Sequence, residues 1–310
     1  MPIFFARKLD DVLPLGRIEV NRVTSGSFDR DWNGNVKQAT RIIPILIIAL
    51  VIMAPVCVLS GGDSAEREVS VTLDDGALVE VIGQNAEVRL VPSESNELTL
   101  TAKLNNAEYV DFYTQSLTPS PVAHFVISAT TGTGGQTTAN SVLEIAIPDG
   151  TQVAVRTTNR SIHVQGVTVS SFELETEDGN VNVENVIGDV QVTTSNSAVS
   201  VRDVAGSTTI MTTNGHVWFR DELSSGRNSI TTENGDIFVE LLPGSDVHVT
   251  GETHNGSVTI NDSTDGVDED GDQAEFVHVI GDGTARLSIT NGPGAIHINP
   301  STIAAFDTSQ

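Results

Sequence analysis

Short runs of alternating apolar and polar residues follow one another through the second half of the chain. Two clear copies, Val190–Val201 and Ser229–Val239, each hold two such runs joined by Thr-rich residues and an Asn-Gly-like corner. In an extended run, successive side chains point to opposite faces, so one face is apolar and the other polar. The apolar positions are mostly β-branched, which favours strands. The pattern therefore predicts a succession of short β-strands.

The runs recur with near-constant spacing. Within a copy, the second apolar residue of the first run lies seven residues before the first apolar residue of the second run, as in Val155 and Ile162. Val249 and Val258, which are nine apart, are the exception. From copy to copy, the first apolar residue of the second run advances by a nearly constant step through Ile162, Val181, Val199, Val217, Ile237 and Val258. About eight copies therefore fit between residues 153 and 298, and the seventh, which passes through Val277, is incomplete. A fixed period of roughly 20 residues is typical of stacked repeats.

Two all-β architectures accommodate this period. In a parallel β-solenoid each copy is one coil, and equivalent corner residues stack about 4.8 Å apart. In a meander of Asn-Gly hairpins the same residues lie about twice as far apart. We predict the solenoid, because the apolar columns persist while the loop residues vary. Its corners would carry a ladder of asparagines: Asn159, Asn196, Asn214, Asn234, Asn255 and Asn291.

The corners also carry glycines, and the stretch before the repeats differs in spacing. Gly179, Gly215, Gly235 and Gly256 are predicted to adopt positive φ at these corners. Residues 60–152 contain alternating runs with irregular spacing, such as Val79–Val81 and Leu143–Ile145. We expect them to form irregular first coils that cap the open edge, because an uncapped edge would pair with other chains.

The entry to the repeats resembles a known family. The stretch Leu143–Val155 contains Ile-Pro-Asp-Gly-Thr at Ile147–Thr151 and leads into Thr/Asn/Gly-cornered coils. Over about residues 66–298 this resembles the bacterial and archaeal putative-adhesin domain. The resemblance implies a β-helical domain on an envelope protein and brings no catalytic residues. The first copy departs by carrying Arg160 where Gly is usual, and the seventh lacks the corner.

Residues 42–59 form an 18-residue run without a charge. As a helix it would be about 27 Å long, enough to cross the hydrocarbon core of a bilayer. A buried core helix would have a polar face, and a cleaved signal peptide rarely follows forty residues. Lys37 and Arg41 precede the run, whereas Asp63, Glu66 and Glu68 follow it. We therefore predict a retained transmembrane helix in the cell membrane, with a largely disordered tail (1–41) in the cytoplasm and the large domain outside.

The charge distribution limits the partners. The net charge is −25, and the first 41 residues carry seven basic and five acidic residues, so the remainder carries −27. Such a surface repels nucleic acid, and we predict no nucleic-acid binding. The only cysteine, Cys57, lies within the apolar run, which excludes disulfides and a thiol nucleophile in the large domain.

An acidic insertion interrupts the seventh copy. Asn261, Ser263, Asp265 and Asp272, around Gly266, loosely imitate the ligand spacing of a calcium loop. Calcium is the one cofactor that this spacing suggests. The alternative is a solvated acidic loop, because the last ligand is Asp rather than Glu and no helices flank it.

No catalytic constellation is present. His163, His248, His278 and His297 each stand between two apolar residues, so they are predicted to point outward singly rather than to converge on a metal. Neither a Gly-x-Ser-x-Gly elbow nor a His-Glu-x-x-His helix occurs. We predict that the protein is not an enzyme. A polysaccharide-active enzyme, the alternative, would need an acidic groove with a basic residue.

Together these features predict a single-pass, membrane-anchored β-solenoid at the cell surface, with a short tail at 299–310. Its outward Thr, Ser and Asn side chains would bind an envelope polymer or a surface protein, as an adhesin-like module. The alternative function is structural or signalling, through self-assembly or through a cytoplasmic partner of residues 1–41.

Overall fold

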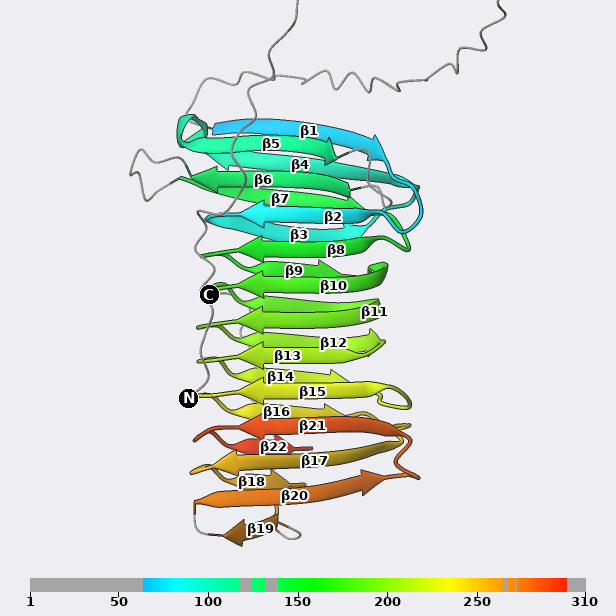
Figure 1. The fold of residues 1–310 in the computed structure, drawn as a ribbon, viewed down its shortest axis with the longest axis vertical. Helices are drawn as coiled ribbons and strands as arrows, with labels where there is room; N and C mark the ends of the chain where they lie inside the picture. The colour runs from blue at the N-terminus through cyan, green and yellow to red at the C-terminus, as the bar shows by residue number, and fades with distance from the viewer. Residues whose placement is uncertain (1–63, 118–123, 132–138, 265–266, 271, 300–310) are drawn as a thin grey trace, which may run out of the picture. The chain divides into compact units, whose positions relative to one another are not determined.

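The computed structural model describes residues 64–117, 124–131, 139–264, 267–270 and 272–299 (Figure 1). All of them belong to one compact unit, residues 52–310. The other unit, residues 1–51, lies outside the described residues, as do the whole predicted membrane segment 42–59 and the tail 300–310. Within the part that is described, no helix is long and apolar enough to cross a bilayer.

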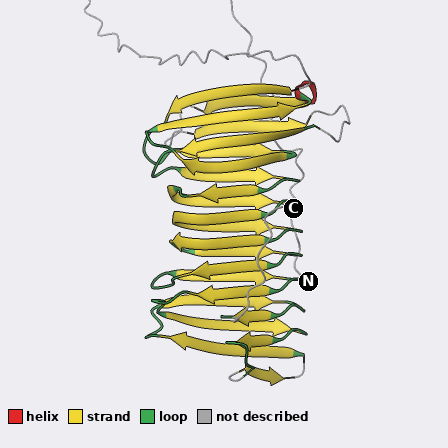
Figure 2. Ribbon diagram, turned by 180° about the vertical axis from the view of Figure 1, so that it is seen from behind, coloured by secondary structure: helices red, strands yellow, loops and turns green. Residues whose placement is uncertain are grey.

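The described chain winds into two rows of parallel strands, which Figure 2 shows with the loops at their ends. Row 1 contains, in stacking order, β6 (His124–Thr131), β2 (Leu78–Gly83), β8 (Gln152–Thr157), β10 (Thr168–Thr176), the second half of β11 (Val181–Thr194), β13 (Thr208–Thr212), β15 (Arg227–Thr232), β21 (Ala285–Asn291) and β17 (Val247–His254).

Row 2 lies behind row 1 and is built in the same way. It contains β7 (Asn140–Ile147), β3 (Ala86–Pro92), β9 (Ile162–Gln165), the first half of β11, β12 (Val199–Ala205), β14 (Val217–Asp221), β16 (Ile237–Leu241), β22 (Ile296–Ile298) and β18 (Val258–Ile260).

Antiparallel strands close both ends. At one end β1 (Ser64–Thr72) pairs with β4 (Glu97–Asn105), which pairs with β7, and β5 (Val110–Leu117) pairs with β6. A 3-10 helix at Ala107–Tyr109 joins β4 to β5. At the other end β20 (Gln273–Ile280) pairs with β17, and β19 (Val267–Asp270) pairs with β20.

Each sequence copy is one coil. Val181 pairs in parallel with Val199, and Val199 pairs with Val217, so one sequence period returns the chain to the same place one strand further along. The all-β, solenoid-like fold predicted from the period is confirmed, and the hairpin meander is wrong. Columns of aliphatic side chains fill the space between the rows, and Ile162, Val181, Val199, Val217 and Ile237 are all fully buried.

The corner glycines serve a different purpose from the one predicted. None of Gly179, Gly215, Gly235 and Gly256 has a positive φ. A Cβ on Gly215 would instead lie 1.8 Å from the Ser197 carbonyl oxygen. On Gly235 it would lie 2.2 Å from the Gly215 carbonyl oxygen. These positions therefore need glycine because successive corners approach too closely for a side chain.

The coils do not all stack in sequence order. The coil β21–β22 lies between β15–β16 and β17–β18, and the predicted seventh coil is absent because residues 267–280 form the antiparallel strands β19 and β20. At the other end β2–β3 is a regular coil, placed between β6–β7 and β8–β9. The end caps are therefore less irregular than the spacing of residues 60–152 predicted, and β5 was not predicted.

Candidate binding surface

The outer face of row 2 carries a continuous column of side chains, one from each of the seven strands that stack from β9 to β18. In stacking order the column contains His163, Asn182, Ser200, Trp218, Phe238, His297 and Thr259. Each occupies the position between two buried apolar residues, as His297 does between Ile296 and Ile298. Because strand neighbours alternate in direction, these side chains point away from the core. We call this set the row 2 column.

Aromatic rings fill the central part of the row 2 column. The rings of Trp218 and Phe238 are stacked, with centroids 5.6 Å apart and planes inclined by 11°. The rings of Phe238 and His297 are stacked at 4.9 Å and 14°. These separations are close to the spacing between neighbouring strands, so the rings stack on one another along the solenoid axis. The faces therefore contact one another, and the ring edges face outward.

Polar pairs flank the rings on both sides. His216 packs edge-on against Trp218 at 5.6 Å and lies 3.7 Å from the Asp236 carboxylate. On the other side, Arg220 forms an ion pair with Glu240 at 3.2 Å. The aromatic strip thus has a charged border on each side, which is the arrangement of a binding surface with an apolar centre and a polar rim.

Polar contacts continue the column beyond the stacked rings. His297 Nδ1 is 2.8 Å from the Thr259 hydroxyl, and His163 Nδ1 is 3.3 Å from the Asn182 amide nitrogen. Burial lowers the pKa of His163; Glu87 opposes this effect and the nearby Arg89 adds to it. His163 is therefore more often neutral than a solvated histidine, and its ring serves as a hydrogen-bonding partner of Asn182 within the row 2 column.

The predicted asparagine ladder is only partly continuous. Asn234, Asn214 and Asn196 form consecutive amide hydrogen bonds, and Asn196 continues to Asp178 Oδ1 at 2.8 Å. Asn159 instead donates to Asn85 Oδ1 at 2.6 Å.

The rest of the predicted ladder is interrupted: Asn291 lies elsewhere, and Asn255 keeps a corner position but is separated from Asn234 by one coil. Asn291 pairs in register with Thr232 and Thr253 and is buried, so it belongs to the inward threonine column rather than the corner ladder. The same register places Pro293 between the corners of Asn234 and Asn255. Both differences follow from the interposed coil β21–β22.

The predicted calcium residues lie in two turns. Asn261, which has a positive φ, and Ser263 follow β18, where Ile260 and Ser263 exchange backbone hydrogen bonds. The Asp272 carbonyl accepts the Asn255 amide at 2.6 Å. Asp265 and Gly266 lie outside the described residues. Over the stretches that are described, no group of three acidic, histidine or cysteine side chains is placed to hold a metal. Calcium binding here stays a prediction.

The predicted histidines do not converge. His163, His248 and His297 point outward as expected, whereas His278 pairs with Val249 and faces the core side of β20. Burial lowers the pKa of His278. Its inward direction was misjudged because β20 runs antiparallel as an end strand instead of forming a coil.

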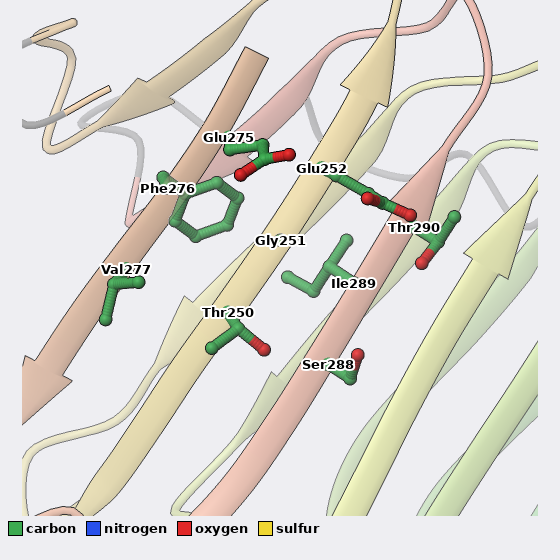
Figure 3. Close-up of a pocket in the computed structure, with 9 residues that line it drawn as sticks. All are labelled: Thr250, Gly251, Glu252, Glu275, Phe276, Val277, Ser288, Ile289 and Thr290. Carbon is green, nitrogen blue, oxygen red and sulfur yellow. The ribbon is translucent and has the colours of Figure 1, made fainter. Parts of the chain in front are cut away.

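A shallow hollow of about 650 Å³ lies on the outer face of row 1, across β21, β17 and β20 (Figure 3). Glu252 lies directly opposite Glu275, and Phe276 and Ile289 line the hollow between the strands. The lining includes hydroxyls from Thr250, Ser288 and Thr290 but no basic side chain. It therefore differs from the expected polysaccharide-active groove, because the paired carboxylates have no basic residue beside them.

A second hollow surrounds Asp221 at the far end of β14. Asp221 is only 5% exposed, and its Oδ1 accepts the Glu222 amide at 2.8 Å. Burial raises the pKa of Asp221 to about 6; the Glu222 and Val204 amides oppose this effect, while Asp203 and Glu222 add to it. This carboxyl group thus has a pKa well above that of an ordinary aspartate, and nothing in the repeat pattern indicated it.

The sequence contained a signal for the aromatic strip that the repeat pattern alone did not reveal. Trp218, Phe238 and His297 all occupy the polar position of the second run in their copies. Recognising that His297 stacks on Phe238 required the non-sequential coil order, because the coil β17–β18 and the antiparallel strands β19 and β20 come between them in the chain.

Comparison with known proteins gives the same family as the sequence resemblance. The profile of the Toastrack DUF4097 family matches residues 137–299, more than half of the chain. A solved structure of a "putative cell adhesion protein" from Clostridium sporogenes is similar over 77% of this chain and 100% of its own, with 10% identity and a TM-score of 0.42. A "putative adhesin" from Parabacteroides merdae is similar over 75% of this chain and 95% of its own, with 11% identity and a TM-score of 0.34. No curated protein matches. From the extent of the family match, the chain belongs to the DUF4097 (Toastrack) family.

Proposed function

We propose that this protein is an adhesin-like binding module anchored in the membrane and displayed outside the cell, and that the row 2 column is its contact surface. The observation that carries the proposal is the outward aromatic strip Trp218–Phe238–His297 with the Arg220–Glu240 ion pair on one border. Partly exposed aromatic side chains contribute most to protein recognition when a polar rim surrounds them.

The orientation of the rings favours a protein partner over a sugar polymer. Sugars stack on the faces of aromatic rings, and here those faces contact neighbouring rings of the same column. Outward ring edges and imidazole nitrogens suit carbonyl groups and apolar side chains of a protein surface. We therefore propose a surface protein as the partner, and an envelope polymer as the alternative outcome of the test.

Membrane anchoring is part of the proposal and rests on the uncharged run 42–59. Four residues separate this run from the first strand, so the β1 end would lie within roughly 14 Å of the bilayer. Carbonate extraction of membranes tests the anchor, because a peripheral protein is released and a spanning one is retained. Exposure of the C-terminal domain to added protease on intact cells tests the orientation.

We further propose that the module has no catalytic activity. Support comes from the sequence, which contains neither a Gly-x-Ser-x-Gly elbow nor a His-Glu-x-x-His motif. Release of reducing ends from envelope polysaccharide by the purified protein would contradict this part.

Binding is tested with the full-length protein reconstituted in vesicles and incubated with cell surfaces. We expect Trp218→Ala and Phe238→Ala to lower vesicle retention at least ten-fold, because the column loses its stacked centre. The matched control is Thr209→Ala, which removes an outward side chain from row 1. Equal retention of all three variants would exclude the row 2 column. Protease treatment of the target surface that leaves retention unchanged would favour the polymer over the protein partner.

A further inference from the structure

The last coil of the chain is inserted between two coils that are neighbours in sequence. Residues 285–298 form β21 and β22, and these lie between β15–β16 and β17–β18 (Figure 1). The strands β15–β16 and β17–β18 therefore form the two walls of a slot one coil wide. We call this slot the last-coil slot.

The inserted coil is the sheet connection between the solenoid body and its end. Over the described strands, β17 pairs with β20 and β21, β18 pairs with β22, and β19 pairs with β20. Among these described strands, the partners of β15 and β16 on this side are β21 and β22. The end segment 247–280 is thus joined to the body by sheet pairing only through residues that come after it in the chain.

The two walls of the slot carry similar residues at equivalent positions, whereas the coil between them carries different ones. Thr253 and Thr232 occupy the same inward column, and Val258 and Ile237 occupy another. The inserted coil places Asn291 in the threonine column and Pro293 in the corner column. The threonine column and the aliphatic column therefore continue in the coils on both sides of the inserted coil.

The interior of the slot is apolar and suited to a coil of this sequence. Leu287, Ile289, Ile296 and Ile298 from the inserted coil are at most 1% exposed. Of the outward positions of the same coil, Ser288 is exposed, whereas His297 stacks on Phe238 of one wall and lies 2.8 Å from the Thr259 hydroxyl of the other. A second copy of residues 285–298 would make the same contacts, because recognition depends on side chains that every copy carries.

A short clamped hinge controls the entry of the coil. Residues 281–284 connect β20 to β21, and both Gly281 and Gly283 have positive φ. The Asp246 carboxylate accepts the amides of Gly283 and Thr284 at 2.6 and 3.2 Å and the Thr284 hydroxyl at 2.6 Å. One partly buried side chain, Asp246, thus fixes the conformation of the hinge from which the coil begins.

We propose that the last-coil slot is an exchange site, which accepts residues 285–298 either from its own chain or from a second copy of the protein. Exchange of an identical element between copies needs no new interface, because each contact is already made within one chain. The slot lies at the opposite end of the solenoid from β1 (Figure 1). If the proposed anchoring holds, this end points away from the membrane, so exchange would link copies on facing surfaces.

Cysteine pairing between two different variants tests the exchange directly. Ser229 and Ser288 are partners on adjacent parallel strands, at a spacing that suits a disulfide. One full-length variant carries Ser229→Cys and the other Ser288→Cys, and both carry Cys57→Ser to remove the only native cysteine. After mixing and mild oxidation, exchange brings these two cysteines into register on adjacent strands, whereas cross-links from random collisions also appear with the control pair described next.

The expected result is a heterodimer band on non-reducing gels, at least five-fold stronger than with the matched control pair Gln191→Cys and Ser288→Cys. Gln191 lies in the same outward column but three coils from Ser288. Asp246→Ala is expected to speed formation of the band at least three-fold. A chain carrying both Ser229→Cys and Ser288→Cys must close an internal disulfide, which verifies folding and geometry.

An internal disulfide without a heterodimer band would overturn the exchange, as would equal bands from the test and control pairs. Neither result depends on Trp218 or on any surface partner, so a failure here leaves the proposed binding function intact. Conversely, a heterodimer band together with unchanged retention of Trp218→Ala vesicles would support exchange and contradict the row 2 column.

Discussion

Asn214 Nδ2 donates a hydrogen bond to Oδ1 of Asn196 at 2.8 Å, although a whole coil separates them along the chain. Asn234 repeats the contact on the other side, donating to Asn214 Oδ1 at 2.9 Å. Each amide thus donates to one coil and accepts from the next, and the spacing of the coils fixes both bonds. The hydrogen bonds of the corner ladder therefore form only when successive coils stack in register.

Replacing the central amide should loosen three coils together. We expect Asn214→Ala to lower the free energy of unfolding by about 1–2 kcal/mol, because two side-chain hydrogen bonds are lost. Urea denaturation followed by circular dichroism measures the change. Thr231→Ala, on the outer face of row 1, is the control and should change it by less than about 0.5 kcal/mol. An equal effect of both substitutions would mean that the ladder contributes nothing specific.

The glycine beside the ladder is subject to a stricter limit. A Cβ on Gly235 would lie 2.2 Å from the Gly215 carbonyl oxygen, which belongs to backbone that cannot move without breaking the coil pairing. We expect Gly235→Ala to cost about 2–4 kcal/mol, measured by the shift of the urea midpoint. Ser195→Ala, at an exposed corner two coils away, is the control. A Gly235→Ala protein as stable as the wild type would contradict the close approach of the corners.

Asp221 makes stability depend on pH in the direction opposite to a salt-bridged carboxylate. Its pKa is raised from 3.8 to about 6 by burial, so the folded protein holds a proton that the unfolded chain releases. Stability should therefore fall as pH rises from about 4 to about 6, by at most about 3 kcal/mol, and then level off. Asp221→Asn should remove this slope and stabilise the protein at pH 7. Unfolding measured at pH 4, 5, 6 and 7 tests both; an unchanged slope in Asp221→Asn would assign the dependence to other groups.

Much of the fold was predictable because it rests on a local pattern. The position of each strand follows from alternation, and coil stacking follows from the step between copies, as between Val181 and Val199. The order of the end coils could not be predicted. Val258, Ile237 and Ile296 are all β-branched aliphatic residues of the same column, so Val258 would pair equally well with either of the other two. The sequence therefore does not decide which coil lies next to which.

The candidate site was less predictable than the fold for a related reason. Periodicity identifies inward positions, because these must be apolar, but outward positions are constrained only by their contacts across coils. His297 was predicted to be a single exposed histidine, and it becomes part of an aromatic strip only when β22 lies beside β16. Asp221 gave no signal at all, because its burial depends on how β14 continues into the following turn.

The C-terminal end of the core offers a test of how the solenoid is closed. Gly251 occupies an inward position in β17, opposite Phe276 of β20, and a Cβ there would lie 2.2 Å from the Phe276 ring. Phe276, only 4% exposed, thus takes the volume that an aliphatic side chain fills in other coils. Gly251→Val and Phe276→Ala should each lower stability by about 3 kcal/mol, the first by overpacking and the second by leaving a cavity. Because valine at 251 would fill that cavity, the double variant should lose at least about 1 kcal/mol less free energy of unfolding than the two single losses added together.

Urea denaturation of the wild type, the two single variants and the double variant measures this difference. The control is Gly251→Val combined with Val277→Ala, whose side chain points outward, and it should show simple additivity. Additivity in the Phe276 cycle as well would mean that the ring and the glycine do not share one space, and that the core is closed by other residues.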